Sequence, residues 1–198
     1  MKPLCTHTGK AVPLRRSNVD TDQLYPAQRI LGGSLTKHGH ANALMAEWRS
    51  NPDFVLNRPE HAGATILVAG PEFATGSSRE WAVWALADYS FRVILAPSFG
   101  DIFRGNATNN GLVAAALPIA AIETLWGRIE DEPDTPVTVD LERRAVSLRG
   151  EQFELEYPED FRRLVMAGLD EVDLTLRHAG DIDAYEARRR ASLPKVGS

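Results

Sequence analysis

Residues 64–96 have the sequence ATILVAGPEFATGSSREWAVWALADYSFRVILA, and this stretch decides the fold. It begins with a short apolar run at residues 64–69 and ends with a second at residues 91–96, and each run predicts a buried strand. A loop with glycine at both ends, Gly70 and Gly76, leads from the first run into an apolar helix. A strand, a helix and a strand in succession favour a parallel strand pair joined by a crossover helix.

The flanking sequence extends this pattern on both sides. Before the deciding stretch, the sequence predicts a partly extended segment at residues 7–14, a polar loop at 17–26 and a helix at 41–49. After it, the expected helices are residues 99–109, 118–129 and 158–167, and the expected strands are residues 112–117, 137–141, 145–148 and 152–156. The last three strands alternate apolar and polar residues, which is typical of an antiparallel sheet. We therefore predict an α/β core over residues 1–168.

Beyond Gly168 the sequence changes character. Residues 169–190 predict one or two amphipathic helices, with Leu174, Leu176 and Tyr185 among the apolar positions. Residues 169–198 are therefore expected to form a helical tail, separate from the core, that docks against another subunit.

Composition restricts the class of protein. The chain has 198 residues, of which 43% are hydrophobic and 25% are charged, so a wholly disordered or fibrous chain is excluded. Its apolar runs fall short of the roughly 20 residues that cross a bilayer, and its N-terminus lacks the pattern of a signal peptide. We expect a soluble, cytoplasmic protein that does not bind a membrane.

Charge and cysteine content narrow the possible partners. The net charge is −5, and residues 123–160 hold twelve acidic and four basic residues, which leaves the rest of the chain mildly positive. Small anionic ligands therefore fit better than nucleic acid, and the run RRR at residues 188–190 is interpreted as a solvated surface. The only cysteine is Cys5. One thiol cannot hold an iron–sulfur cluster, which needs several thiolates, so another chain must supply any such cluster.

The start of the helix in the deciding stretch carries the candidate chemistry. Ser77, Ser78 and Arg79 stand where helix amides and a partial positive charge favour anions. The guanidinium of Arg79 suits the carboxylate of a small organic acid, and a serine alkoxide stabilised by the same field could act as a base. The competing interpretation is structural, because Ser77 and Glu80 have the spacing of an ordinary capping box. The spacing alone leaves both interpretations open.

The sequence lacks the other common templates for a functional site. It contains no phosphate-binding P-loop, no Gly-x-Gly-x-x-Gly turn, no Gly-x-Ser-x-Gly nucleophile elbow and no Cys and His set with metal-site spacing. Its five histidines are each interpreted as ordinary surface or core residues: His7, His38, His40, His61 and His178. We therefore expect no metal ion on this chain.

Three segments resemble sequence blocks of the aconitase superfamily's swivelling domain. Residues 70–82 (GPEFATGSSREWA) contain its Gly-Ser-Ser-Arg-Glu signature. Residues 18–26 (NVDTDQLYP) and 99–112 (FGDIFRGNATNNGL) are similar to its Asn-x-Asp-Thr-Asp-x-Ile-x-Pro and Phe-x-x-Ile-Phe-x-x-Asn-x-x-x-Asn-Gly-Leu blocks. In length and in its single cysteine, the chain resembles the small subunits of the 3-isopropylmalate dehydratase family. The resemblance covers most of the chain and implies a swivelling β/β/α domain.

The resemblance also implies an activity and an assembly. In this family a large partner subunit holds an iron–sulfur cluster that acts as a Lewis acid on the substrate, and the small subunit, which binds no cofactor itself, caps the site. The implied reaction converts a small dicarboxylate, 2-isopropylmalate, to 3-isopropylmalate in leucine biosynthesis, by loss and re-addition of water. By motif position, Ser77 would be the alkoxide base, and Ser78 and Arg79 would hold the substrate carboxylates.

A further segment is implied to select the substrate. The loop between the first two blocks matches the family's selectivity loop in position, so Arg29, Ile30 and Leu31 are candidate substrate-binding residues. Ile30 and Leu31 could contact an isopropyl group or pack in the core, and a methylene-scale fit discriminates by only about 1–3 kcal/mol. The chain departs from the family pattern at Glu72, at residues 74–76 (ATG) and at Trp81, where the family has Asn, Gly-x-Gly and His. Trp81 is expected to pack rather than react.

Two alternatives remain open from the sequence. A sister hydro-lyase that acts on homoaconitate or a methyl-substituted malate would share all three blocks. A non-catalytic carboxylate-binding module would use Ser77 only as a helix cap.

Overall fold

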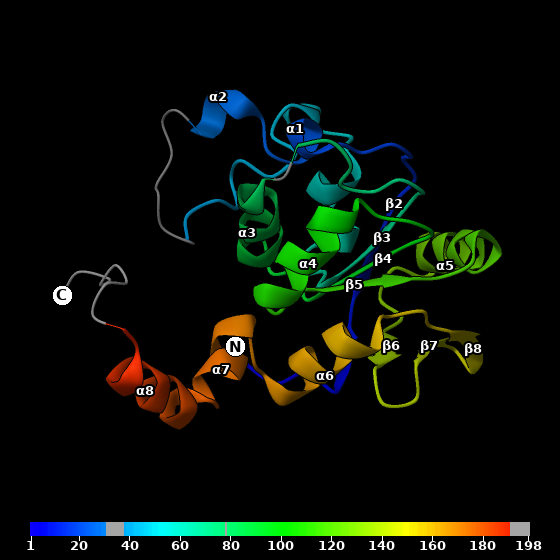
Figure 1. Ribbon diagram of the computed structural model, residues 1–198. Helices are drawn as coiled ribbons and strands as arrows, with labels where there is room; N and C mark the ends of the chain where they lie inside the picture. The colour runs from blue at the N-terminus through cyan, green and yellow to red at the C-terminus, as the bar shows by residue number, and fades with distance from the viewer. Residues whose placement is uncertain (31–37, 78, 191–198) are drawn as a thin grey trace.

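The computed structural model describes residues 1–30, 38–77 and 79–190 (Figure 1). Within these residues the strands form two sheets of four strands each, and helices pack around them. The expected α/β class is therefore confirmed. In the part of the chain that is described, no helix is long and apolar enough to cross a membrane.

The first sheet is parallel and forms the centre of the molecule. In spatial order its strands are β2 (Ala11–Leu14), β3 (Ile66–Ala69), β4 (Val93–Ala96) and β5 (Val113–Ala116). All neighbouring strands in it pair in parallel. Helix α3 (Glu80–Asp88) connects β3 to β4, and α4 (Asp101–Asn109) connects β4 to β5. The strand–helix–strand unit predicted for residues 64–96 is confirmed.

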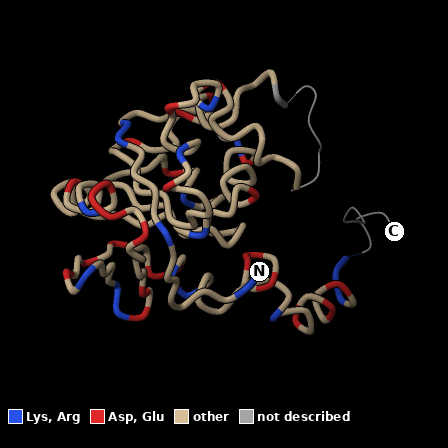
Figure 2. The backbone as a smooth tube through the Cα atoms, turned by 180° about the vertical axis from the view of Figure 1, so that it is seen from behind, with Lys and Arg blue, Asp and Glu red and all other residues tan. Residues whose placement is uncertain are grey.

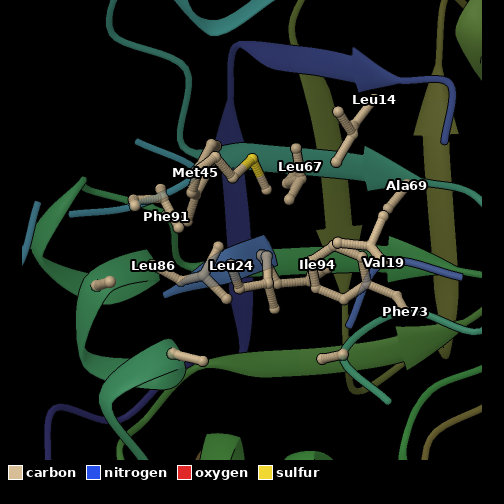
Figure 3. Close-up of a cluster of buried hydrophobic side chains, with 14 of the residues drawn as sticks. Leu14, Val19, Leu24, Met45, Leu67, Ala69, Phe73, Leu86, Phe91 and Ile94 are labelled. Carbon is tan, nitrogen blue, oxygen red and sulfur yellow. The ribbon is translucent and has the colours of Figure 1, made fainter. Parts of the chain in front are cut away.

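The two faces of this sheet support different layers, because successive side chains of a strand point to opposite faces. One face packs against α3 and α4, and Figure 3 shows Leu67 and Ile94 on it together with Leu86 of α3. The other face packs against α5 (Ile119–Asp131) and the second sheet. Both faces of the strands are buried, so the sheet holds the loops at its carboxyl ends in fixed positions.

The second sheet is antiparallel. Its strands in spatial order are β1 (Thr6–Gly9), β6 (Val137–Asp140), β7 (Ala145–Leu148) and β8 (Glu151–Glu154). The sequence predicts the β6–β8 meander, and the structure confirms it. Pairing of β1 with β6 joins distant parts of the chain, and the Thr8 and Thr138 hydroxyl oxygens lie 2.8 Å apart across it. Helix α6 (Glu159–Ala167) follows and ends at Gly168, whose φ of 70° suits glycine.

The prediction of a helix at residues 41–49 is wrong. The chain there forms turns and a short 3-10 helix, η1 (Trp48–Ser50). Met45 has a φ of 47°, and its amide donates a 2.8 Å hydrogen bond to the carbonyl oxygen of Leu24. A non-glycine residue in the left-handed region interrupts a right-handed helix, so the tie to Leu24 overrides the helical spacing. Two further 3-10 turns, η2 (Val55–Asn57) and η3 (Pro59–His61), lead into β3.

The segment predicted as a polar loop, residues 17–26, contains the single-turn helix α1 (Thr21–Leu24). Asp20 caps this helix and forms a capping box with Gln23, which holds so short a turn in place. A second single turn, α2 (Ala27–Ile30), follows.

Some of the acidic side chains in residues 123–160 form ion pairs with basic side chains from elsewhere in the chain. Glu130 accepts a 2.6 Å hydrogen bond from Arg15, and Asp134 accepts a 2.7 Å bond from Lys10, so both acids pair with N-terminal cations. Figure 2 shows acidic and basic residues interspersed along α5 and the second sheet. The acidic stretch therefore does not build a surface of one charge sign.

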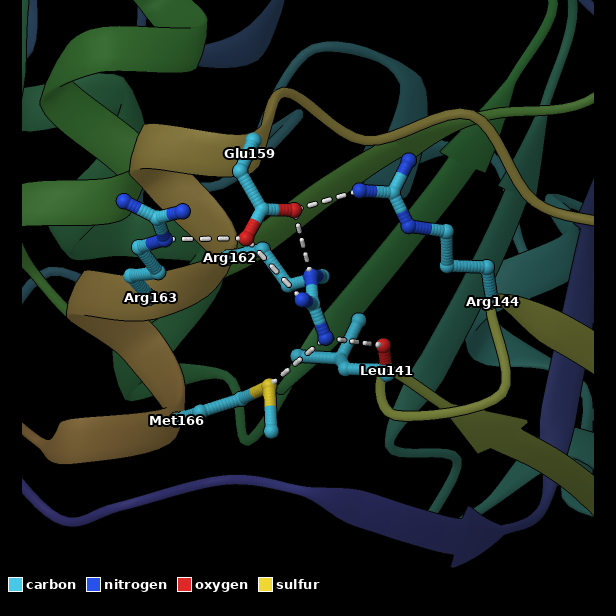
Figure 4. Close-up of polar contacts among 6 residues, drawn as sticks. All are labelled: Leu141, Arg144, Glu159, Arg162, Arg163 and Met166. Atoms are coloured by element: carbon cyan, nitrogen blue, oxygen red, sulfur yellow. Dashed lines mark hydrogen bonds and ion pairs between the residues drawn. The ribbon is translucent and has the colours of Figure 1, made fainter.

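A cluster of three arginines surrounds Glu159 at the start of α6 (Figure 4). Its carboxylate accepts 2.9 Å hydrogen bonds from the Nε atoms of Arg162 and Arg163 and a further bond from Arg144. These contacts, that with Arg162 above all, lower the pKa of Glu159 from 4.5 to about 2. Arg162 also donates to the carbonyl oxygen of Leu141 at 3.2 Å, so the cluster ties α6 to the turn between β6 and β7.

Acid should weaken this cluster. Because the pKa of Glu159 is lower in the folded chain than in the unfolded one, its stabilisation is complete above about pH 4.5 and is lost as the pH falls through about 2. We expect Glu159→Gln to lower the Tm at neutral pH, and this difference from wild type should disappear in strong acid. Thermal unfolding across pH measures it, with Glu154→Gln on β8 as the matched control. A difference that does not change with pH would contradict the prediction.

Residues 169–190 form two helices, α7 (Glu171–Leu176) and α8 (Ala179–Arg188), as the sequence predicts. Figure 1 shows α8 extending away from both sheets, and none of its residues is buried. Several of the apolar side chains are open to solvent, with Val172 65% and Leu176 60% exposed. Helices this short are marginal in water without tertiary contacts. The division of the chain at residue 168 and the docking role of the tail stay predictions.

Candidate active site

A cavity of about 300 Å³ lies at the carboxyl ends of the central strands. Its wall comes from α1, from the loop between β3 and α3, and from the start of α4 with the residue before it. The polar side chains that line it are those of Thr21, Thr75, Ser77, Arg79, Asp101 and Asn106. Parallel α/β sheets usually bind ligands at this edge. The three segments of the wall are the three sequence blocks, so the structure brings all of them to one place.

Backbone hydrogen bonds hold the three segments together. The amide of Thr21 donates to the carbonyl oxygen of Thr75 at 3.0 Å, and the amide of Gly100 donates to that of Phe73 at 2.9 Å. A Cβ atom at Gly100 would lie 2.4 Å from the carbonyl oxygen of Ala74, so only glycine allows this approach. The shape of the wall is therefore fixed by the backbone.

Ser77 lies in the loop before α3 and is exposed in the cavity wall. Gly76 precedes it with a φ of 89°, and the hydroxyl of Thr21 donates a 2.9 Å hydrogen bond to the carbonyl oxygen of Ser77. The predicted capping box is wrong, because α3 begins at Glu80 with Arg79 as its N-cap residue and with no side-chain capping bond among the described residues. Among the described residues, no capping bond joins the Ser77 side chain to α3, and Ser77 is exposed where a ligand in the cavity can reach it.

Contacts of Arg79 explain why the helix begins late. Its backbone is extended, with φ −112° and ψ 107°. Its guanidinium pairs with the carboxylate of Asp22 and lies 3.5 Å from the carbonyl oxygen of Tyr25. The Arg79 side chain is only 18% exposed, so the pair is partly shielded from water. A guanidinium has five N–H donors, and those not used by Asp22 can bind a carboxylate in the cavity.

Sequence reasoning missed several residues of the wall. Thr21 fixes the Ser77 carbonyl, and Asp101 and Asn106 line the side of the cavity that α4 builds. Asp22 lies outside the lining and pairs with Arg79. Their positions within the first and third blocks were the only signal for them, and that signal did not show which members of a block would face Ser77.

The side chains of four predicted site residues are outside the described part of the structure. Ser78 and Leu31 lie outside the described residues. Arg29 and Ile30 belong to α2, but their side chains are not described. Their roles in substrate binding stay predictions.

Of the three departures from the family pattern, residues 74–76 line the cavity, whereas Glu72 and Trp81 lie outside its lining. The carboxylate of Glu72 accepts a 2.7 Å hydrogen bond from the hydroxyl of Ser98, so this acid stabilises the loop. Trp81 packs against the core, with its ring 5.7 Å from that of Trp84. The expectation that Trp81 packs is confirmed.

The histidines have ordinary surroundings. His40 and His61 are buried, and burial lowers the pKa of His61, whereas His38 and His178 are exposed. In residues 1–30, 38–77 and 79–190, no group of three or more His, Cys, Asp or Glu could hold a metal ion. Cys5 is the only cysteine of the chain. A single thiol does not suit an iron–sulfur cluster, which takes several thiolates.

Comparison with known proteins agrees with the three blocks. The family profile of the aconitase C-terminal domain matches residues 1–120, and the profile of the C-terminal domain of the 3-isopropylmalate dehydratase small subunit matches residues 171–196. A protein of Acidothermus cellulolyticus named 3-isopropylmalate dehydratase small subunit is 57% identical, over 98% of both chains. This chain belongs to the 3-isopropylmalate dehydratase small-subunit family.

Other members of the 3-isopropylmalate dehydratase small-subunit family agree over the full length. The relative from Salinispora tropica is 53% identical over 99% of this chain and 100% of its own, and that from Streptomyces coelicolor is 48% identical over 99% and 98%. A crystal structure of 3-isopropylmalate dehydratase from Methanocaldococcus jannaschii has the same fold. Its TM-score is 0.66 at 24% identity, and the match covers 91% of this chain and 99% of that one. The fold class implied by the resemblance is therefore confirmed.

Proposed function

We propose that this chain is the small subunit of a cytoplasmic hydro-lyase that interconverts 2-isopropylmalate and 3-isopropylmalate in leucine biosynthesis. One observation carries the proposal. Ser77 and Arg79 line one cavity that all three sequence blocks build. Ser77 is not the N-cap residue of α3, and Arg79 is held by Asp22. The reaction loses water from the substrate to give an unsaturated diacid and then adds water in the opposite orientation.

A larger partner subunit is part of this proposal. The cavity is open at the surface of the chain, and this chain lacks the thiolates for an iron–sulfur cluster. The cluster is expected on the partner, where it would supply Lewis-acid chemistry toward the substrate hydroxyl.

Ser77 is assigned the role of base for the carbon-bound proton. A serine hydroxyl has a pKa far above neutral, so it can act as a base only where its alkoxide is strongly stabilised. The guanidinium of Arg79 and the amides at the start of α3 lie in the same stretch of chain and favour negative charge there. Closure of the cavity by a partner would exclude water and strengthen both effects.

Arg79 and Ser78 are assigned the role of holding the substrate carboxylates. A carboxylate and a guanidinium form two parallel hydrogen bonds, which fix orientation as well as position. Asp22 keeps the Arg79 fork from rotating, so little entropy is lost when the substrate binds. Arg29, Ile30 and Leu31 are assigned to the side-chain end of the substrate.

A substrate panel tests this assignment. The assembled pair should turn over isopropylmalate faster than methyl-substituted malates or homoaconitate, by about 10–200-fold for a pocket that reads apolar size. A preference for homoaconitate or a methyl-substituted malate would assign the chain to a sister hydro-lyase. Binding of these organic acids without any turnover would favour the non-catalytic module.

The tail is proposed to dock on the large subunit. Replacing the exposed Ile182 of α8 by serine should raise the Kd for the large subunit about tenfold, because an apolar contact is lost. Deleting residues 169–198 should weaken binding further and leave the core folded. Ile119→Ser, a similarly exposed isoleucine at the start of α5, is the matched control. Binding titrations with the large subunit measure both, and an unchanged Kd after deletion would reject the docking role.

A further inference from the structure

Asn110, directly after α4, does not line the cavity but makes a set of hydrogen bonds with α3 and α4. Its Nδ2 donates to Oε1 of Glu80 at 2.9 Å and to the carbonyl oxygen of Asn106 at 2.8 Å. Its Oδ1 accepts from the indole Nε1 of Trp84 at 3.2 Å. The residue therefore joins the end of α4 to two places on α3.

The chemistry of the three partners fixes how the Asn110 amide is oriented. A carboxylate and a carbonyl oxygen can only accept, and an indole N–H can only donate. The Nδ2 group must therefore face Glu80 and Asn106, and Oδ1 must face Trp84. A side chain needs donors and an acceptor at this length to satisfy all three, which an aspartate cannot do.

These contacts act on the segment that carries the candidate base. Glu80 is the first residue of α3 and follows its N-cap residue, Arg79. On the other side, Arg79 is held by Asp22 and approaches the carbonyl oxygen of Tyr25. Arg79 and Glu80 are therefore held at two points, one at Asp22 on α1 and one at Asn110.

Trp84 extends the same contacts across α3. Its ring lies 5.6 Å from that of the buried His40, whose Nδ1 is 2.9 Å from the hydroxyl oxygen of Tyr25. Tyr25 follows α1 in the block that contains Asp22. Contacts thus run from Asn110 through α3 and back to the segment that holds Arg79.

We propose that Asn110 is a positioning residue that sets the place of Ser77 and Arg79 through Glu80 and Trp84. The inference rests on the proposed function, because it names the groups that Asn110 positions. Displacement of a catalytic group by about 1 Å can lower a rate by about 100-fold, so a small shift at the start of α3 is enough to matter.

An exchange of donor and acceptor tests the proposal in the full chain assembled with its large subunit. Asn110→Asp places a carboxylate against Glu80 and should lower kcat by about 10–100-fold. Adding Glu80→Gln to that variant supplies a new donor toward the introduced carboxylate and should recover about tenfold of the loss. Glu80→Gln alone, in which a glutamine oxygen still accepts from Asn110, is the reference against which the double variant is compared. Asn109→Asp, one residue earlier on α4, is the matched control.

A second measurement is independent of activity. Hydrogen exchange of the amides of residues 79–82 should be faster in Asn110→Asp and should return toward wild type when Glu80→Gln is added. A merely structural role would lower Tm without changing kcat at a temperature where the variant is folded, and that result would overturn the proposal. A loss of kcat that Glu80→Gln does not relieve would overturn it too. If the wild-type pair lacks isopropylmalate turnover, the proposed function fails, and the exchange rates still decide whether Asn110 holds the start of α3.

Discussion

Replacing Ser77 by alanine should lower kcat of the assembled pair by about 10²–10⁴-fold, the usual contribution of a positioned general base. The hydroxyl is exposed in the cavity wall, and α3 does not use it as a cap. Its removal should therefore leave the fold and the binding of the large subunit unchanged. Because the base acts mainly in the transition state, the loss should appear in kcat rather than in KM.

Steady-state kinetics and a binding titration on the same preparation check this prediction. Ser50→Ala is the matched control, since its hydroxyl donates only to the local carbonyl oxygen of Glu47 on the surface. A cap residue replaced by alanine typically costs about 1 kcal/mol of stability and no activity. A Ser77→Ala pair with wild-type kcat and a lower Tm would therefore favour a purely structural role for Ser77 over that of a base.

Arg79→Lys should lower kcat/KM by about 100-fold, although the charge is kept. An ammonium cannot form two parallel hydrogen bonds to a carboxylate, and it cannot pair with Asp22 while it also binds substrate in a fixed plane. The loss of orientation should affect KM and kcat together. Arg128→Lys, in the surface pair with Glu151, is the matched control for the same chemical change.

Kinetics on the two lysine variants decide between a bidentate and a purely electrostatic role. If Arg79 served only as a positive charge, lysine would replace it with little change in kcat/KM. Substrate binding that is equally tight in Arg79→Lys and wild type would therefore contradict the assigned role.

Local patterns in the sequence were sufficient for most of the fold. Apolar runs of six residues predicted β3, β4 and β5, and alternation predicted the β6–β8 meander. Pairing of β1 with β6 could not be predicted, because nothing near Thr8 indicates a partner 130 residues away. The helix predicted at residues 41–49 failed for a similar reason, since the tie from Met45 to Leu24 is a tertiary contact.

The candidate site was predicted in part. The Gly-Ser-Ser-Arg-Glu signature indicated Ser77 and Arg79, and both line the cavity. The helix start was misplaced by a few residues, because the ion pair of Arg79 with Asp22 acts from another block and outweighs the local capping pattern. Asn110 follows the helix predicted at residues 99–109, but its role was not predicted, since its bonds to Glu80 and Trp84 depend on how α4 packs against α3.

We propose that this cavity is half of a reaction centre and that a cluster-bearing partner supplies the other half. One anaerobic assay of isopropylmalate isomerisation tests it, with the small subunit alone, the large subunit alone and the two together. We expect turnover only when the small and large subunits are present together. Turnover by the small subunit alone, or by the large subunit at the rate of the mixture, would contradict it.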